Sequence, residues 1–417
     1  MNMMTELNHI VAELEEELIG IRRDIHKYPE IGFEEKETSQ KIIHTLKKHG
    51  CTQLRSEIVG TGVLCTIQGA EPGPVIALRV DIDALSNCND ECRKNYASVK
   101  KDICHACGHD VHTTIGLGVA AVMQQFKGRF KGTAEIFFQP SEELPKKIDP
   151  TLEYDGFTEP PVGYRAAYLA REEGVLESPH VDRLLGIHCW PQLNVGCVGY
   201  QYGVAMAGTG NFHISILGKH GHAGTPHKTV DAIILAAQVV MSLQTVVSRK
   251  IDPSLPVVLT IGAIKGGSRR SSVAGLVDIN GTVRCFDQKA ISEDIPQAME
   301  SIIKGICIGG GGDYKFEYGV DQPPVINNDI VVQESAQSLK SILGNNVIEL
   351  RDAPMTAEDF SWLAEGIPAV YLKLGTAGSD EDTQYPLHNP KFDVDEGCIK
   401  TGVLAIAKTM LDYLGTI

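Results

Sequence analysis

Apolar positions recur along this chain with two periods that alternate over most of its length. Spacings of three and four residues are typical of amphipathic helices, whereas short apolar runs between turn residues are typical of strands. The helical pattern covers residues 7–27, 34–49, 113–126, 164–173, 230–248, 291–304, 330–343 and 396–414. The strand pattern covers residues 74–81, 133–139, 183–188, 211–218, 256–264, 275–284 and 368–375.

The predicted strands are of two kinds. Those near both ends of the chain are continuously apolar, which favours a buried, mostly parallel sheet between helix layers. The central ones alternate: Phe212, Ile214 and Ile216 fall on one side of their strand, and polar residues on the other. We therefore expect an α/β domain formed by residues 1–205 and 318–417, interrupted by a smaller α+β domain of residues 206–317.

Length and charge narrow the class of protein. A chain of 417 residues corresponds to two domains, or to one domain with an insertion. The formal net charge of −15 argues against binding to nucleic acid or anionic lipid. The chain has no apolar run of about 18 residues and no leader-like start, so we expect a cytoplasmic protein without a membrane span.

Eleven cysteines are many, but the number is odd and the chain is long, whereas a disulfide scaffold is typical of small secreted domains without a core. We expect most of them to be reduced and buried. Cys104 and Cys107 have the spacing of a redox dithiol, but no second pair accompanies them. Cys88 and Cys92, in a turn after the first apolar strand, are interpreted as incidental.

Histidines cluster where a predicted strand gives way to a helix. Cys107, His109 and His112 place a thiol and two imidazoles at this junction, from which side chains can converge on a metal ion. A polar helix start capped by Asp110 or Thr113 explains one of these residues but not the group. The motif alone leaves both interpretations open.

Further candidates follow other predicted strands. Glu142 and Glu143 come after the strand at 133–139, His188 ends the next one, and His388 lies in a loop after the last. The carboxyl ends of strands in an open α/β sheet are where ligand sites form. Two solvated loop acids are the alternative interpretation of the glutamate pair.

Eight segments, in order and with their spacing, carry a resemblance that extends from about Ile21 to the C-terminus. They are ALRVDIDAL, CHACGHDVHTT, QPSEE, GIHCWPQLNVGCVG, GKHGHAGTPHKTVDAI, GTVRCFD, AEDFSWL and PLHNPKFDVDE. The chain resembles the metallo-amidohydrolases that include hippurate hydrolase, auxin-conjugate hydrolase and bacterial N-acyl-amino acid aminoacylases, relatives of carboxypeptidase G. The resemblance implies a catalytic α/β domain that binds two divalent metal ions, and a lid domain that mediates homodimer formation.

The resemblance also implies residue roles. The metal ligands would be Cys107, His109, Glu143, His188 and His388. Glu142 would be the general base toward metal-activated water, His222 of the lid would stabilise the oxyanion, and Asp83 would orient a metal-bound imidazole. His227 would contact substrate or pack under the lid. The residues themselves offer Arg269 or Arg284 as a partner for a substrate carboxylate, with solvated lid residues as the alternative interpretation. A thiolate among the ligands favours Zn²⁺ and tolerates Mn²⁺, Co²⁺ or Ni²⁺.

The chain departs from the family pattern in three places. About 15 residues are inserted between Glu143 and Gly163, and we expect this segment, about 144–162, to form a wall of the substrate pocket. Ser271 stands where many relatives carry an asparagine that binds substrate. The turn after Asp83 is unusually rich in cysteine and asparagine.

The function expected from the resemblance is hydrolysis of the amide bond of N-acetyl, N-benzoyl or similar N-acyl amino acids. A dipeptidase on the same scaffold and an N-acetyl-diaminopimelate deacetylase are alternatives, and a non-catalytic binding relative is a remote one. The sequence lacks the G-x-S-x-G, P-loop and G-x-G-x-x-G motifs of serine hydrolases and nucleotide-binding proteins.

Overall fold

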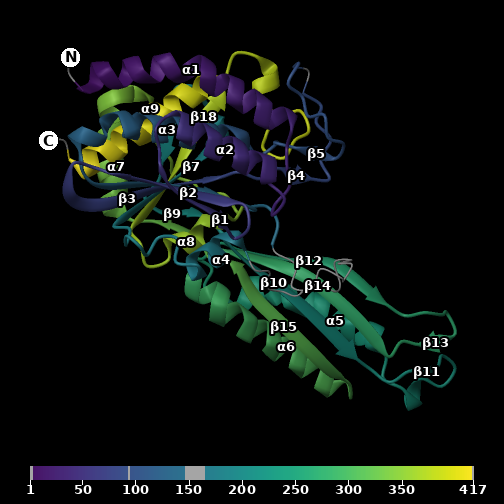
Figure 1. The fold of residues 1–417 in the computed structure, drawn as a ribbon. Helices are drawn as coiled ribbons and strands as arrows, with labels where there is room; N and C mark the ends of the chain where they lie inside the picture. The colour runs from purple at the N-terminus through teal and green to yellow at the C-terminus, as the bar shows by residue number, and fades with distance from the viewer. Residues whose placement is uncertain (1–2, 93, 146–164, 416–417) are drawn as a thin grey trace.

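The computed structural model describes residues 3–92, 94–145 and 165–415. It consists of an α/β body and a smaller lid that projects from it (Figure 1). In the described residues, the chain leaves the body after β9 (Gly203–Met206) and returns to it at β16 (Val325–Asn327), and these two strands pair with each other. The lid is therefore inserted within the body.

The body is built on one large sheet with the strand order β1-β2-β6-β3-β7-β18-β8-β17. In that order the strands are β1 (Gln53–Ile58), β2 (Gly62–Gln68), β6 (Lys131–Gln139), β3 (Glu71–Asp81), β7 (Arg183–Asn194), β18 (Ala369–Ala377), β8 (Val198–Tyr200) and β17 (Val347–Glu349). The central strands β6, β3, β7 and β18 run parallel, so their carboxyl ends lie at one edge of the sheet.

Both faces of this sheet are covered. On β3, Ile76, Leu78 and Val80 join one apolar core, whereas Val75 and Ala77 join another. This explains why the strand is apolar at successive positions rather than at alternate ones. The first core contains α1 (Met3–Lys27), α2 (Lys36–Lys48), α3 (His109–Phe126), α7 (Asp329–Leu343) and α9 (Gly397–Leu414). The second contains α4 (Ala166–Glu172) and α8 (Phe360–Ala364).

The lid has an antiparallel sheet with two helices on one face. Its strand order is β12 (Val257–Gly266), β14 (Leu276–Cys285), β10 (Gly208–Leu217) and β15 (Asp313–Gln322). Helices α5 (Ala232–Thr245) and α6 (Ile295–Gly309) pack on Phe212, Ile214 and Ile216, the three residues that the alternation assigned to one side. The short pair β11 (Gly221–His222) and β13 (Ser272–Val273) lies at the far tip of the lid (Figure 1).

The predicted fold class, an α/β domain with a mostly parallel sheet between helix layers and a smaller α+β insertion, is confirmed. The antiparallel strands β1 and β2 were missed. The mostly exposed sequence of β1 carries no apolar alternation, whereas β2 is largely buried and its apolar residues do fit a strand. The insertion expected at about 144–162, and the start of the helix expected at 164–173, lie mainly outside the described residues.

One helical stretch, Ala232–Lys250, is long and apolar enough to cross a membrane by length and composition alone. It contains α5, whose buried residues Leu235, Ala236 and Val239 pack on the lid sheet. A helix with one face in an apolar core passes the same test.

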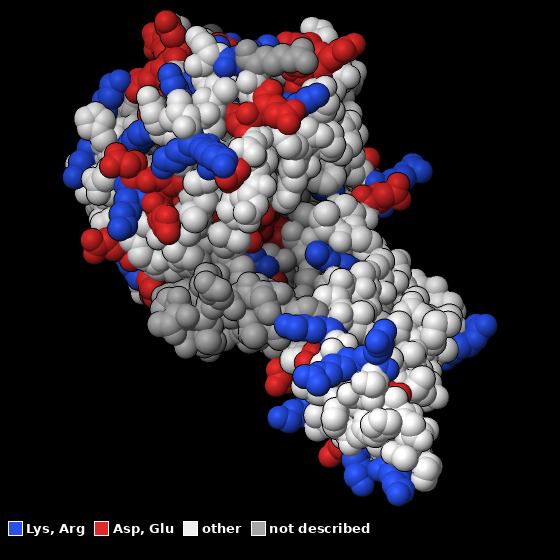
Figure 2. Space-filling view, turned by 90° about the vertical axis from the view of Figure 1, so that its right-hand side faces the viewer, with Lys and Arg blue, Asp and Glu red and all other residues white. Residues whose placement is uncertain are grey.

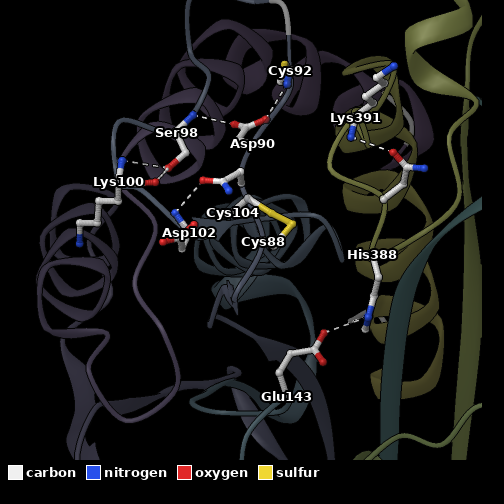
Figure 3. The surroundings of a disulfide bond; sticks show 12 residues. Cys88, Asp90, Cys92, Ser98, Lys100, Asp102, Cys104, Glu143, His388 and Lys391 are labelled. Atoms are coloured by element: carbon white, nitrogen blue, oxygen red, sulfur yellow. Dashed lines mark hydrogen bonds and ion pairs between the residues drawn. A yellow bond between two sulfur atoms is a disulfide. The ribbon is translucent and has the colours of Figure 1, made fainter.

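The interpretation of Cys88 as incidental is wrong. Cys88 is disulfide-bonded to Cys104, next to the short antiparallel pair β4 (Leu85–Ser86) and β5 (Ile103–Cys104) (Figure 3). Cys104 therefore has a partner 16 positions away rather than Cys107. Spacing along the chain could not reveal this pairing, since the loop between the two cysteines brings them together. The other nine cysteines are free.

Candidate metal centre

The carboxyl edge of the central strands gathers most of the candidate ligands. Asp83 follows β3, Glu142 and Glu143 follow β6, His188 lies within β7, and His388 lies in the loop after β18. Parallel pairing of the four strands brings these positions to one edge, although they are up to 305 residues apart in the sequence.

A tight turn adds two more ligand candidates. Gly108 separates Cys107 from His109, the first residue of α3, and has a φ of 84°. A Cβ atom at this position would lie 2.7 Å from the Sγ of Cys189. Because only glycine tolerates both the left-handed conformation and this contact, Gly108 is what allows the thiol and the imidazole to face the same space.

Each of the five expected ligands has a ligand atom within 4.0 Å of a ligand atom of another. Sγ of Cys107 lies 3.5 Å from Nε2 of His188. Oε1 of Glu143 lies 3.3 Å from Nε2 of His388 and 4.0 Å from Nε2 of His109, the fifth ligand. The ligand atoms of Cys107, Glu143 and His388 all lie within 4.8 Å of one another, as do those of His109, Glu142 and Glu143. Two overlapping groups of this kind match the pattern of two neighbouring metal sites.

The backbone and buried acids orient the imidazoles. Nδ1 of His109 lies 3.2 Å from Oδ1 of Asp83, and Nδ1 of His188 lies 2.9 Å from the carbonyl oxygen of Cys189. Each contact leaves the Nε2 atom turned toward the cluster. His112 differs, because its two ring nitrogens contact Asp81 and the backbone N–H of Cys189. It has no nitrogen left for a metal.

Buried ligand atoms without hydrogen-bond partners show that the same residues fit a cation. Nε2 of His109 and Oε1 of Glu143 are buried and have no hydrogen-bond partner. Burial and the neighbouring Glu143 raise the pKa of the Cys107 thiol well above its usual range. Burial and His112 lower the pKa of His188, which keeps its imidazole neutral. A buried thiol, a carboxylate and imidazole nitrogens are a donor set that divalent cations stabilise.

Glu142 lies among acidic neighbours behind the ligand candidates. It is buried, and the backbone N–H of Asp359 donates to its Oε1 at 3.3 Å. Burial, followed by the charges of Glu358 and Glu143, raises the pKa of Glu142 well above its usual range. Arg79 balances part of this charge through ion pairs of 2.9 Å with Glu358 and 2.7 Å with Asp359.

Arg165 is a site residue that the sequence analysis missed. Its Nη1 donates to the carbonyl oxygens of Glu142, at 3.1 Å, and Glu143, at 3.2 Å. Its Nε donates to Oδ1 of Asp321, at the end of lid strand β15, at 3.0 Å. Arg165 thus links the turn that carries both glutamates to the lid. Its partner Asp321 is 156 positions away, so no local motif marked it.

A cavity of about 490 Å³ opens between the body and the lid beside these residues. It is lined by Cys107, Glu142, Glu143, His188, His388, Arg165, Arg284, Trp190, Met206 and Leu387, among others. Figure 2 shows acidic side chains at the bottom of the hollow between the two parts. Of the expected substrate contacts, Arg284 lines this cavity.

Three other expected residues lie elsewhere in the lid. His222 belongs to β11 at the lid tip, is exposed, and accepts a hydrogen bond from the backbone of Gly224. His227 and Arg269 are also exposed. Among the described residues, none of the three lines the cavity of its own subunit. Their expected roles stay predictions.

Comparison with known proteins places the chain in a family. Residues 77–412 match the model of peptidase family M20/M25/M40. The chain is 37% identical, over 324 residues, to an N-acyl-L-amino acid amidohydrolase of Geobacillus stearothermophilus. The match covers 78% of this chain and 81% of that amidohydrolase. It is 31% identical, over 394 residues, to an N-acetyldiaminopimelate deacetylase of Priestia megaterium. That match covers 94% of this chain and 97% of the deacetylase.

A solved structure gives the same result. The YxeP protein of Bacillus subtilis, described as a dinuclear metal binding peptidase of family M20, superposes with a TM-score of 0.80 at 30% sequence identity. The match covers 97% of this chain and 100% of that one. The two overlapping ligand groups of this chain are therefore found in a fold that holds two metal ions in a relative.

Proposed function

The chain belongs to peptidase family M20/M25/M40, and we propose that it is a metal-dependent amidohydrolase that cleaves the amide bond of N-acyl amino acids. The observation that carries this proposal is the pair of ligand groups at one end of the cavity, with Glu142 beside them. Cys107, His109, Glu143, His188 and His388 would hold two divalent ions, of which zinc is the first choice and manganese the second. When bound, these ions supply a Lewis acid for the amide carbonyl and lower the pKa of water.

Glu142 would be the general base, a role that the metal ligands cannot take. Its carboxylate, oriented by the backbone N–H of Asp359, is placed to accept a proton from water and to give it to the leaving amine. Burial, together with the charges of Glu358 and Glu143, raises its pKa, and a carboxylate of higher pKa is a stronger base. Proton transfer of this kind typically contributes about 10²–10⁴-fold to the rate.

The cavity lining offers both charged and apolar partners for such a substrate. Arg165 and Arg284 share one carboxylate neighbour, Asp321. Although burial opposes it, Asp321 raises the pKa of Arg165. The pKa of Arg284 is lowered, because burial and the like charge of Arg165 outweigh the effect of Asp321. Two guanidinium groups beside a single acid favour the carboxylate of an amino acid as a third partner. Trp190 and Leu387 offer apolar surface for an acyl group.

The proposal includes a homodimer formed through the lid. Strand β12 is an edge of the lid sheet, and α5 exposes Ile233, Ile234 and Met241, the last with 73% of its surface accessible. An open edge beside an apolar helix face favours pairing with a second copy. A second copy is also the route by which His222 would reach a cavity to stabilise an oxyanion.

Mixing two inactive variants tests this arrangement. Glu142→Gln and His222→Ala are each expected to lose turnover, and co-refolded mixed dimers to regain part of it. Mixed dimers without any regain would contradict a role of His222 across subunits, and a monomer by light scattering would contradict the dimer.

A cytoplasmic location is also part of the proposal. Nine of the eleven cysteines, Cys107 among them, are free, as is typical of a reducing compartment, whereas the Cys88–Cys104 disulfide is unusual there. Cell fractionation with an antibody to the chain tests it. Enrichment in the soluble intracellular fraction is expected, and secretion would contradict it.

A panel of substrates tests the reaction and its alternatives. Protein stripped by a chelator and reloaded with Zn²⁺, Mn²⁺, Co²⁺ or Ni²⁺ is mixed with N-acetyl and N-benzoyl amino acids, N-acetyl-diaminopimelate and dipeptides, and free amine is measured. We expect release from N-acyl amino acids, and loss of it when the substrate carboxylate is removed. Cleavage of dipeptides alone would favour the dipeptidase, and preference for N-acetyl-diaminopimelate the deacetylase.

A further inference from the structure

A second cluster of metal-ligating side chains lies beside the N-terminal helix. The ligand atoms of His26, Asp90 and Cys92 all lie within 4.8 Å of one another. His26 is in the last turn of α1, and the other two belong to the loop after β4. Figure 3 shows Asp90 and Cys92 on this loop, on the opposite side of the Cys88–Cys104 disulfide from the candidate metal centre residues Glu143 and His388.

A carboxylate orients the imidazole of His26, as is typical of histidines that bind metal ions. Its Nδ1 lies 2.8 Å from Oδ2 of Asp110, a carboxylate contact that fixes the ring and leaves Nε2 for another partner. Nε2 is buried and has no hydrogen-bond partner of good geometry. It points into the cluster, 3.3 Å from Oδ2 of Asp90. That separation is close to the spacing of two ligand atoms around one tetrahedral zinc ion.

The other two groups are also fixed in place. The carboxylate of Asp90 accepts hydrogen bonds from the backbone N–H of Cys92, at 2.7 Å, and of Ser98, at 2.6 Å. Sγ of Cys92 lies 3.8 Å from Oδ2 of Asp393, which also accepts a hydrogen bond from Tyr96. Cys92 is only partly buried, so an ion and a water molecule have access.

The surroundings favour a positive charge at this point. Arg22 forms ion pairs with Asp110, Asp393 and Glu396, and Arg23 pairs with Glu396 as well. With Asp90, four carboxylates thus face two guanidinium groups. Although burial and Arg22 oppose it, Asp110 and Asp90 raise the pKa of His26 to about 10.

We propose that His26, Asp90 and Cys92 bind one divalent cation of the zinc type, with water as the fourth ligand, in addition to the ions of the cavity. Imidazole, carboxylate and thiolate are the ligands that zinc takes in proteins. Binding releases the thiol proton of Cys92 and any proton on Nε2 of His26. The ion would fasten the end of α1 to the loop that leads through Cys104 to Cys107.

Metal content tests this site independently of turnover. Wild-type protein, Cys92→Ser and Cys197→Ser are purified in reductant, loaded with Zn²⁺, passed through a desalting column and analysed by plasma mass spectrometry. Cys197 is the matched control, a free cysteine of similar exposure outside the cluster. We expect Cys92→Ser to hold one equivalent less than wild type, and Cys197→Ser to hold the wild-type amount. Both are expected to keep amide hydrolysis.

Two additional samples make the outcome decisive. Asp90→Asn is expected to lose the same equivalent, while its amide oxygen keeps one of the two hydrogen bonds that the carboxylate accepts from the backbone of Cys92 and Ser98. Glu143→Ala is expected to lose metal from the cavity and still hold the Cys92-dependent ion, which separates this site from the catalytic one. With Co²⁺, the wild-type minus Cys92→Ser difference spectrum should contain a thiolate-to-cobalt charge-transfer band. Equal zinc content in wild type and Cys92→Ser, or the absence of that band, would overturn the proposal.

Discussion

Removing the Arg165 side chain tests how the glutamate turn is held. In Arg165→Ala, the carbonyl oxygens of Glu142 and Glu143 lose their donor, and Asp321 loses its ion-pair partner. Both members of the pair are well shielded, with side-chain exposures of 12% for Arg165 and 5% for Asp321. The change therefore leaves the buried charge of Asp321 without its ion-pair partner, and the nearby Arg284 compensates only part of it.

The expected magnitude follows from this burial. Breaking one side of a buried ion pair typically costs about 3–5 kcal/mol of unfolding free energy. The catalytic effect has a different origin, because a shift of the turn by about 1 Å would misplace Glu142 against the substrate and lower kcat/KM by about 10²-fold. Arg165→Lys keeps the charge but loses the fork of donors, and we expect it to recover part of both losses.

Denaturant unfolding and steady-state kinetics are the assays, with Arg171→Ala as the matched control. Arg171 lies in the same segment and pairs with Glu365, but their side chains are 38% and 58% exposed. An exposed pair contributes at most about 1 kcal/mol. We expect Asp321→Asn to restore part of the stability of Arg165→Ala, since it removes the unpaired charge. If Arg165→Ala were no less stable and no slower than Arg171→Ala, the reasoning would be refuted.

Three further predictions concern the centre and the sheet. Glu143→Ala should reduce the metal content of the cavity, measured by plasma mass spectrometry, and an unchanged content would remove Glu143 from the ligands. Gly108→Ala should cost about 1–2 kcal/mol for the left-handed backbone alone, and more for the contact with Cys189, in thermal unfolding; wild-type stability would refute the need for glycine. Burial raises the pKa of Glu135 to about 7, so the unfolded chain loses this proton first and stability falls as pH rises from about 4.5 to 7. Glu135→Gln should therefore gain up to about 3 kcal/mol over wild type at pH 8 and nothing at pH 4, and an equal gain at both pH values would contradict this account.

The sequence predicted the fold well where burial imposes a regular pattern. β10 alternates because one face of the lid sheet is packed and the other is not. β3 is apolar at successive positions from Val75 to Leu78 because helices cover both of its faces. β1 was missed because it lies at the sheet edge with mostly exposed residues, so that burial leaves no mark on its sequence. The pairing of Cys88 with Cys104 depends on a loop path that no local spacing encodes.

The sequence likewise predicted some residues of the candidate site and missed others. Cys107, His109, Glu143 and His388 were predicted as ligands because each is a metal-ligating residue type next to a strand or helix end. The structure brings their side chains together, and their role as ligands stays a prediction. Arg165 was not found, because its role depends on lid and body meeting, and a lone arginine after an insertion carries no signal. His222 lies at the lid tip, where one subunit alone does not connect it to the cavity.

The central claim is that bound metal and Glu142 together hydrolyse the amide of an N-acyl amino acid. The most direct test measures free amine released from an N-acetyl amino acid by wild type and Glu142→Gln, each with its metal content determined in the same sample. We predict that wild-type turnover disappears on chelation and returns with metal, and that Glu142→Gln keeps its metal but is slower by about 10²–10⁴-fold. Turnover by metal-free wild type, or near-wild-type turnover by metal-loaded Glu142→Gln, would contradict the account.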